Sequence, residues 1–114
     1  MGDVNDQVQI PVPMEAIEAF CQKWQIIEFA LFGSVLRDDF RPESDIDVLV
    51  TYAPDADRSL SDYLAMYDEI EALFGREVDV INRESIERSR NYIRRREILS
   101  SARVVMRRTV DSAR

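Results

Sequence analysis

Residues 32–50 read FGSVLRDDFRPESDIDVLV, and they join two strand signals through a polar, charged connection. The apolar run IIEFALF at 26–32 ends at Gly33, and its length suits a buried strand better than a helix. The β-branched run DIDVLVTY at 45–52 predicts a second strand. The polar residues between the two runs predict one short helical turn and a loop.

The segments on either side supply further elements. Apolar residues recur at helical spacing over 14–24 and again over 59–74, which predicts two helices with a core-facing stripe. Prolines precede the first helix, and a serine at the start of the second can cap it while Gly75 fits its C′ position. EVDVI at 77–81 predicts a third strand.

The C-terminal segment, residues 85–114, has apolar residues up to Val105 in a broken helical pattern, which predicts one or more helices. The alternation of helices and strands predicts an α/β (α+β) fold, a small mixed sheet of three to four strands packed with helices. We expect a single domain over 11–114, preceded by a flexible N-terminal segment, residues 1–10.

The composition limits the available chemistry. The 114 residues include no histidine and one cysteine, Cys21, which lies on the apolar stripe of the first predicted helix and is interpreted as a packing residue. An internal disulfide and most zinc sites are excluded. No apolar run approaches the roughly 20 residues of a membrane span, and the acidic start is unlike a signal peptide, so we expect a cytoplasmic protein.

The net charge of −7 is distributed unevenly. Residues 1–84 contain 19 acidic and 6 basic residues, whereas residues 85–114 contain 3 acidic residues and 9 arginines. The acidic body argues against direct nucleic-acid binding, which depends on phosphate neutralisation, and it suits divalent cations. The basic end fits an acidic partner or a polyphosphate, or it is simply a solvated helix surface.

Gly33 and Ser34 follow the first predicted strand directly. A glycine at this point lets the backbone approach a bulky ligand, and the N–H groups of a following helical turn favour an anion such as phosphate. The structural alternative is a tight turn in which the serine caps the helix.

Three aspartates stand at the predicted strands. Asp45 and Asp47 flank Ile46 at the entry of the second strand, so in an extended chain both point to one face. Asp79 interrupts the third strand in the same way. Carboxylates that converge favour a hard cation such as Mg²⁺, and a two-metal centre of this kind serves phosphoryl or nucleotidyl transfer. Solvent-facing strand residues are the alternative for all three.

Gly33-Ser34, ten residues and then Asp45-x-Asp47 resemble the signature of the nucleotidyltransferase superfamily of DNA polymerase beta. The small size and the wording SDIDVLV resemble its minimal nucleotidyltransferase (MntA-type) branch. The resemblance covers residues 14–105 and includes the third acid, Asp79. It departs from the family at Asp38, where the family usually has glycine.

The resemblance implies a role for each matching position. Gly33 and Ser34 would hold the β- and γ-phosphates of ATP. Two Mg²⁺ ions would be bound by Asp45 and Asp47, and Asp79 would complete the site of the ion that activates the acceptor hydroxyl. Arg37 would steady the phosphate charge, although an ion pair with Asp38, Asp39 or another nearby acid explains it equally well.

The resemblance also implies a partner. Members of the minimal branch pair with a HEPN toxin and transfer AMP to one of its tyrosines, which makes them antitoxins of type VII toxin–antitoxin pairs. There are two alternatives: the protein is an antitoxin that acts by binding alone, or it is a nucleotidyltransferase that acts on a small molecule. Of the basic residues, Arg90 and Arg94 share a helix face that is either solvated or in contact with toxin or nucleotide. Three tyrosines are expected in or partly in the core, with base stacking as the alternative: Tyr63, Tyr67 and Tyr92.

Overall fold

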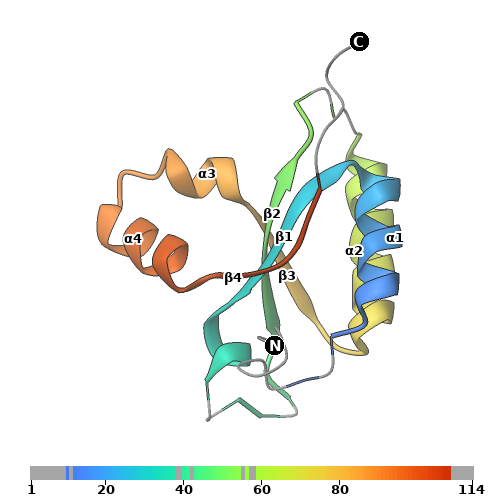
Figure 1. Cartoon of the computed structure of the whole chain (residues 1–114), viewed down its shortest axis with the longest axis horizontal. Coiled ribbons are helices and arrows are strands. Elements are labelled where there is room, and N and C mark those ends of the chain that lie inside the picture. The colour runs from blue at the N-terminus through green and yellow to red at the C-terminus, as the bar shows by residue number, and fades with distance from the viewer. Residues whose placement is uncertain are drawn as a thin grey trace.

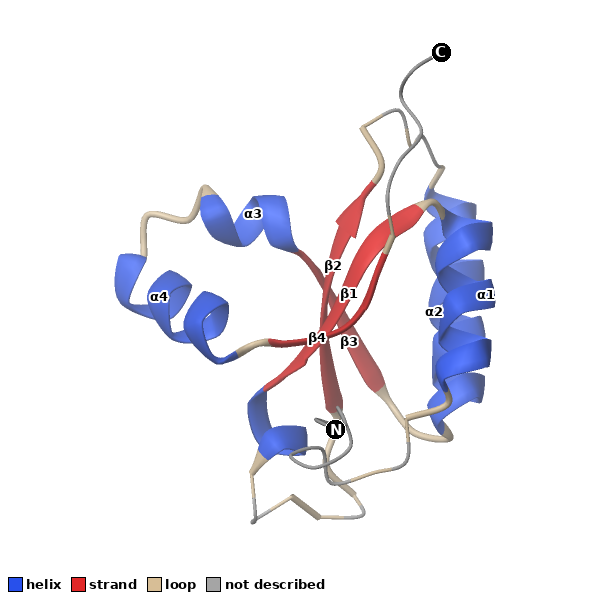
Figure 2. Cartoon of the chain, viewed as in Figure 1, coloured by secondary structure: helices blue, strands red, loops and turns tan. Residues whose placement is uncertain are grey.

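A computed structural model of the chain describes residues 10, 12–37, 40–41, 43–54, 56 and 59–108. It contains a mixed four-stranded sheet with helices on both faces (Figures 1 and 2), as the sequence predicted. The elements in chain order are α1 (Met14–Trp24), β1 (Ile26–Phe32), η2 (Gly33–Leu36), β2 (Ile46–Tyr52), α2 (Leu60–Phe74), β3 (Val78–Asn82), α3 (Arg83–Glu87), α4 (Tyr92–Ser101) and β4 (Arg103–Arg107).

The strands are arranged in the order β3-β2-β1-β4. β1 is antiparallel to both of its neighbours, β2 and β4, whereas β2 and β3 are parallel. A parallel pair needs a crossover connection, and α2 supplies it. The β2–β3 register sets Asp47 opposite Asp79, so the two acids lie on neighbouring strands.

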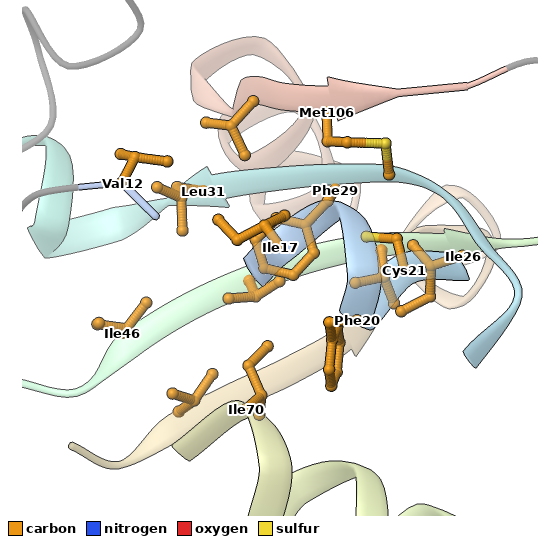
Figure 3. Packing of buried hydrophobic residues seen from close by; sticks show 14 of the residues in the cluster. Val12, Ile17, Phe20, Cys21, Ile26, Phe29, Leu31, Ile46, Ile70 and Met106 are labelled. Atoms are coloured by element: carbon orange, nitrogen blue, oxygen red, sulfur yellow. The ribbon is translucent and has the colours of Figure 1, made fainter. Parts of the chain in front are cut away.

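The main core lies between the sheet and the helices α1 and α2, which cover the same face (Figure 1). Phe29 is fully buried in it, with the rings of Phe20 and Phe74 at centroid distances of 6.4 Å and 6.5 Å. Figure 3 shows the apolar side chains from both helices and the strands meeting there. Cys21 belongs to this cluster, in agreement with a packing role.

A smaller apolar cluster lies on the opposite face, where α3 and α4 extend away from the sheet (Figure 2). Leu49 and Phe32 from the strands contact Ile86 of α3 and Ile98 of α4 in this cluster. Because side chains alternate along a strand, every second residue of β2 and β3 faces α3 and α4 rather than the main core.

The helix α2 has both of the predicted caps. Ser59 accepts a hydrogen bond from the backbone N–H of Asp62, whose side chain accepts one from the backbone N–H of Ser59. Gly75 adopts φ +73°, a left-handed conformation that ends the helix without strain because glycine has no Cβ. These local signals fix the length of the crossover helix.

Two expectations for the C-terminal segment are wrong. Val105 lies in β4 rather than in a helix, because RVVMR at 103–107 pairs with the free edge of β1. This pairing is a tertiary contact that helical spacing alone cannot predict. The second is Tyr92, which is 64% exposed on α4 and does not lie in or partly in the core. Tyr63 of α2 is also exposed, at 39%, so the same expectation is wrong there. Tyr67 is partly buried as expected, and its hydroxyl donates a hydrogen bond to the carbonyl of Val80.

The proposed N-terminal segment, residues 1–10, falls mostly outside the described part of the chain. Its last residue, Ile10, packs against the main core. Among the helices that the structure describes, none combines the length and the apolar character required for a membrane span.

Candidate active site

Asp47 is the second residue of β2, and its side chain faces α3 and α4. Its neighbours Ile46 and Val48 both belong to the main core, so alternation turns Asp47 to the other face of the sheet. The carboxylate is partly buried there. The sequence pattern of an acid between two β-branched residues is thus explained by the strand: its β-branched residues are buried in the main core, and its acid lies on the other face of the sheet.

Asp79 occupies the equivalent place on β3. It lies between Val78 and Val80, whose side chains pack in or against the main core, and it is the register partner of Asp47. Adjacent strands are about 4.8 Å apart, so the two carboxylates emerge side by side from one face. Asp45 precedes β2 and is exposed. The structure therefore brings together Asp47 and Asp79, the two acids on separate strands that were expected to share one site.

Gly33 directly follows β1 and lies against the carboxylate of Asp47. It has φ +80°, and a Cβ atom built on it would lie 2.5 Å from Oδ2 of Asp47. Any other residue would be strained by its backbone and would collide with the carboxylate. Phe32 is the register partner of Asp47 across the antiparallel β1–β2 pair, which explains why the turn reaches this carboxylate.

Ser34 and Arg37 belong to the same turn. Ser34 lies inside η2 and does not cap it, because Phe32 occupies the N-cap position and no side chain caps the turn. The backbone N–H of Arg37 donates to the carbonyl of Ser34 at 2.9 Å, and the Arg37 side chain is exposed. Asp38 and Asp39, the proposed alternative partners of Arg37, lie outside the described residues.

The electrostatics of this group of acids favour a bound cation. Burial raises the pKa of the Asp47 carboxyl, and the charges of Asp79 and then Asp45 raise it further. The charges of Arg37 and Arg94 oppose this increase. The ionised acids therefore repel one another, and a divalent cation between them would relieve that repulsion.

The donor set fits magnesium. Carboxylate oxygens are its preferred protein ligands, and Mg²⁺ commonly takes only one or two carboxylates together with waters and substrate phosphates. Within the described ranges, no three acidic, cysteine or histidine side chains are grouped closely enough to hold a metal ion by themselves. The paired carboxylates of Asp47 and Asp79, together with Asp45 just before β2, are the groups that would hold the metal ions.

A pocket of about 480 Å³ adjoins this group at Gly33. One wall is formed by the end of β1 and by η2, through Phe32, Leu36 and Arg37. A second wall comes from α4 and from the first residue of β4. The residues of that wall are Arg94, Glu97, Ile98, Ser101 and Arg103. The sequence indicated Arg94 as part of a helix face that is either solvated or in contact with toxin or nucleotide, and it did not single out Arg103. Tertiary packing brings both residues to the pocket beside Gly33.

A larger hollow, about 780 Å³, lies at the other end of the sheet. It is lined by the ends of β2 and β3 with parts of α2 and α3, including Tyr52, Tyr63 and Asn82. Glu28, which also lines it, forms ion pairs with Arg83 at 3.6 Å and Arg107 at 3.1 Å. None of the described residues around it is one of the predicted site residues, so size alone does not identify the active site.

Comparison with known proteins agrees with this geometry. The family model of the nucleotidyltransferase domain matches residues 13–105. The chain belongs to this nucleotidyltransferase family. The matched range begins just before α1 and ends in β4, so it includes β1, β2, β3, the first part of β4 and all three aspartates. The family that the Gly-Ser and Asp-x-Asp spacing indicated is thereby confirmed.

Individual members of the nucleotidyltransferase family are similar to the chain. A candidate protein adenylyltransferase of Methanocaldococcus jannaschii, MJ1379, is 38% identical over 64 residues, which are 56% of this chain and 64% of that protein. The matched segment thus spans less than two thirds of this relative. The structure of a candidate minimal nucleotidyltransferase superposes with a TM-score of 0.59 at 28% identity, covering 77% of this chain and 84% of that one.

A chain from a crystal structure of a toxin–antitoxin with AMP-PNP superposes with a TM-score of 0.62. The two chains are 13% identical, and the superposition covers 86% of this chain and 76% of that one. At this level of identity the similarity establishes a shared fold.

Proposed function

We propose that the protein is a magnesium-dependent nucleotidyltransferase that transfers AMP from ATP to a protein hydroxyl, and that it acts as the antitoxin of a toxin–antitoxin pair. The observation that carries the proposal is the register of Asp47 with Asp79 beside the Cβ-free face of Gly33. This arrangement combines paired carboxylates with a backbone turn that a bulky phosphate can approach.

Each site residue has a distinct role in this proposal. Asp45 and Asp47 would hold two Mg²⁺ ions, and Asp79 would complete the site of the ion next to the acceptor. Gly33 and Ser34 receive the β- and γ-phosphates, and Arg37 balances part of their charge. When bound, the metal ions would lower the pKa of the acceptor hydroxyl and stabilise charge on the phosphate oxygens.

The reaction is an in-line displacement. The hydroxyl oxygen of the acceptor forms a bond to the α-phosphorus of ATP as the bond from that phosphorus to the bridging oxygen of pyrophosphate breaks. The proton of the hydroxyl passes to Asp79, because the chain has no histidine to accept it. Because ATP is the donor, we propose the cytoplasm as the site of the reaction.

The acceptor is proposed from the relatives. MJ1379 carries the name of a protein adenylyltransferase, and a chain of similar fold comes from a toxin–antitoxin complex with AMP-PNP. These names support a protein acceptor, and we propose a tyrosine of a HEPN toxin as the specific target. Direct nucleic-acid binding is not part of the proposal, since the body of the chain is acidic.

The proposal is tested with the purified chain, ATP, Mg²⁺ and the protein encoded beside it. We expect mass spectrometry to detect one or more AMP groups on the partner, located on tyrosine. The double variant Asp45→Asn with Asp47→Asn should abolish the labelling, whereas Asp68→Asn, at an exposed acid of α2, should leave it unchanged. Wild-type labelling by the double variant would refute the site.

A toxicity assay separates catalysis from binding. If the folded double variant no longer neutralises the toxin, transfer of AMP is the basis of neutralisation. If it neutralises the toxin fully, the chain is an antitoxin that acts by occlusion. Labelling of a small molecule in place of the protein would favour the remaining alternative, a nucleotidyltransferase with a small-molecule acceptor.

A further inference from the structure

The pocket beside Gly33 carries an excess of positive charge. Arg37, Arg94 and Arg103 line it together with one acid, Glu97. The three arginines come from three separate places in the chain: the residue after η2, the first turn of α4 and the start of β4. A cluster assembled from distant parts of the sequence on one pocket differs from a solvated helix face, which was the simpler interpretation of the basic C-terminal segment.

Within the described part of the chain, the side chains of two of these arginines form no polar contacts of the kind that stabilise the fold. Across the described ranges, the side chains of Arg94 and Arg103 have no hydrogen-bond or ion-pair partner. Other arginines of the segment are engaged: Arg88 pairs with Glu84 at 3.1 Å, and Arg95 donates to the carbonyl of Ser89 at 3.2 Å. The guanidinium groups of Arg94 and Arg103 thus remain available to a ligand.

The position of Arg94 links the pocket to the acids. Arg94 lines the same pocket as Gly33. Gly33 belongs to both parts of the site, since it lines the pocket and lies against Asp47. A ligand that reaches from the carboxylates past Gly33 therefore meets Arg94.

We propose that Arg94 and Arg103 bind the β- and γ-phosphates of the nucleotide from the side opposite Gly33 and Ser34, so that α4 and β4 form the second wall of the triphosphate site. This inference rests on the proposed function. Guanidinium groups bind phosphate through paired, charge-assisted hydrogen bonds, which a lysine cannot reproduce in the same geometry. The same contacts stabilise the charge that develops on pyrophosphate as it leaves.

Glu97 has the opposite effect on the same pocket. Its carboxylate lines the wall one turn of α4 after Arg94, so it repels the phosphates that the arginines attract. Replacement of this acid by its neutral amide should therefore strengthen triphosphate binding. This expectation is independent of the loss expected from the arginine variants, and it acts in the opposite direction.

The test is calorimetric titration of the full chain with AMP-PNP and, separately, with AMP, both with Mg²⁺. Arg94→Gln and Arg103→Gln should each weaken AMP-PNP binding about 10- to 100-fold, as expected for loss of a charge-assisted hydrogen bond. Arg94→Lys should recover only part of this loss. AMP binding should change less than about twofold, because AMP lacks the β- and γ-phosphates. Glu97→Gln should tighten AMP-PNP binding.

The matched control is Arg96→Gln, an exposed arginine of the same helix that does not line the pocket. All four substituted residues are exposed, so the variants should fold, and circular dichroism checks this. Equal AMP-PNP affinity of the Arg94, Arg103 and Arg96 variants would overturn the inference while leaving the proposed function intact. Failure of the wild-type chain to bind AMP-PNP would overturn both.

Discussion

Gly33 and Asp47 are held so close together that a Cβ atom on the glycine would lie 2.5 Å from Oδ2 of the aspartate. The two residues stand near opposite ends of the Gly-Ser…Asp-x-Asp stretch in the sequence, and the antiparallel pairing of β1 with β2 brings them into contact. A side chain at position 33 would therefore force the Asp47 carboxylate to move.

Substitution Gly33→Ala tests this contact. The left-handed backbone at φ +80° should cost about 1–3 kcal/mol of stability, and the new methyl group must also displace the Asp47 carboxylate. Since a shift of about 1 Å in a catalytic group can reduce a rate about 100-fold, we expect AMP transfer to fall by that factor or more. Denaturant titration and a transfer assay measure the two effects.

The control for this variant is Gly75→Ala. Gly75 has a similar φ of +73°, but a Cβ atom there would meet nothing within 4 Å. The Gly75→Ala variant should lose a similar amount of stability from backbone strain and retain full AMP-transfer activity. Equal activity of the two variants would contradict the proposed contact between Gly33 and Asp47.

Asp47→Asn should make the metal-free protein more stable and inactive. Burial, then the charges of Asp79 and Asp45, raise the pKa of the Asp47 carboxyl above its ordinary 3.8, so the folded chain holds this proton more tightly than the unfolded chain. Stability consequently falls as the pH rises from 3.8 through the raised pKa, and the penalty is complete above it. The amide removes the penalty.

We therefore expect thermal melts without metal to give Asp47→Asn a Tm a few degrees above that of the wild type at pH 7. The difference should shrink as the pH approaches 4. Added Mg²⁺ should raise the Tm of the wild type, because binding adds about 2.7 kcal/mol to the free energy of unfolding when the Mg²⁺ concentration is 100 times the Kd. The Tm of the variant should stay nearly unchanged. A variant less stable than the wild type at pH 7 would argue against repulsion among these acids.

Phe29→Ala should produce a large loss of stability. Phe29 is fully buried between the rings of Phe20 and Phe74, and truncation of such a side chain leaves a cavity that costs about 3–5 kcal/mol. Leu64→Ala is the control, because Leu64 is 60% exposed on α2 and should change stability by less than about 0.5 kcal/mol. Urea titration of both variants gives the comparison.

Cys21 should resist thiol reagents in the folded protein. The side chain is fully buried, and burial raises the pKa of its thiol to about 12, with the charge of Arg108 opposing this effect. The reactive thiolate is therefore scarce at pH 8. Labelling by a disulfide reagent should follow unfolding of the chain and accelerate in urea. Rapid labelling of the native protein would show that the main core opens easily.

Local sequence signals predicted α1, α2 and the first three strands, because each depends on spacing within one segment. The caps of α2 are an example, since Ser59 and Gly75 act on residues within a few positions of themselves. β4 was missed for the opposite reason. The run RVVMR at 103–107 is only five residues long and does not alternate between polar and apolar residues. It forms a strand because it pairs with the edge of β1, about 75 residues earlier in the chain.

The sequence by itself determined the chemical groups and their local directions: paired acids at a strand entry, a glycine after a strand and a basic C-terminal segment. Alternation along a strand is a property of the backbone, so the side of β2 that carries Asp47 followed once its apolar neighbours were placed in the core. Only the tertiary structure decided that Asp79 stands opposite Asp47, that Gly33 lies against that carboxylate and that Arg94 and Arg103 line the adjoining pocket. Those relationships depend on strand register and helix packing, which are set by contacts between segments far apart in the chain.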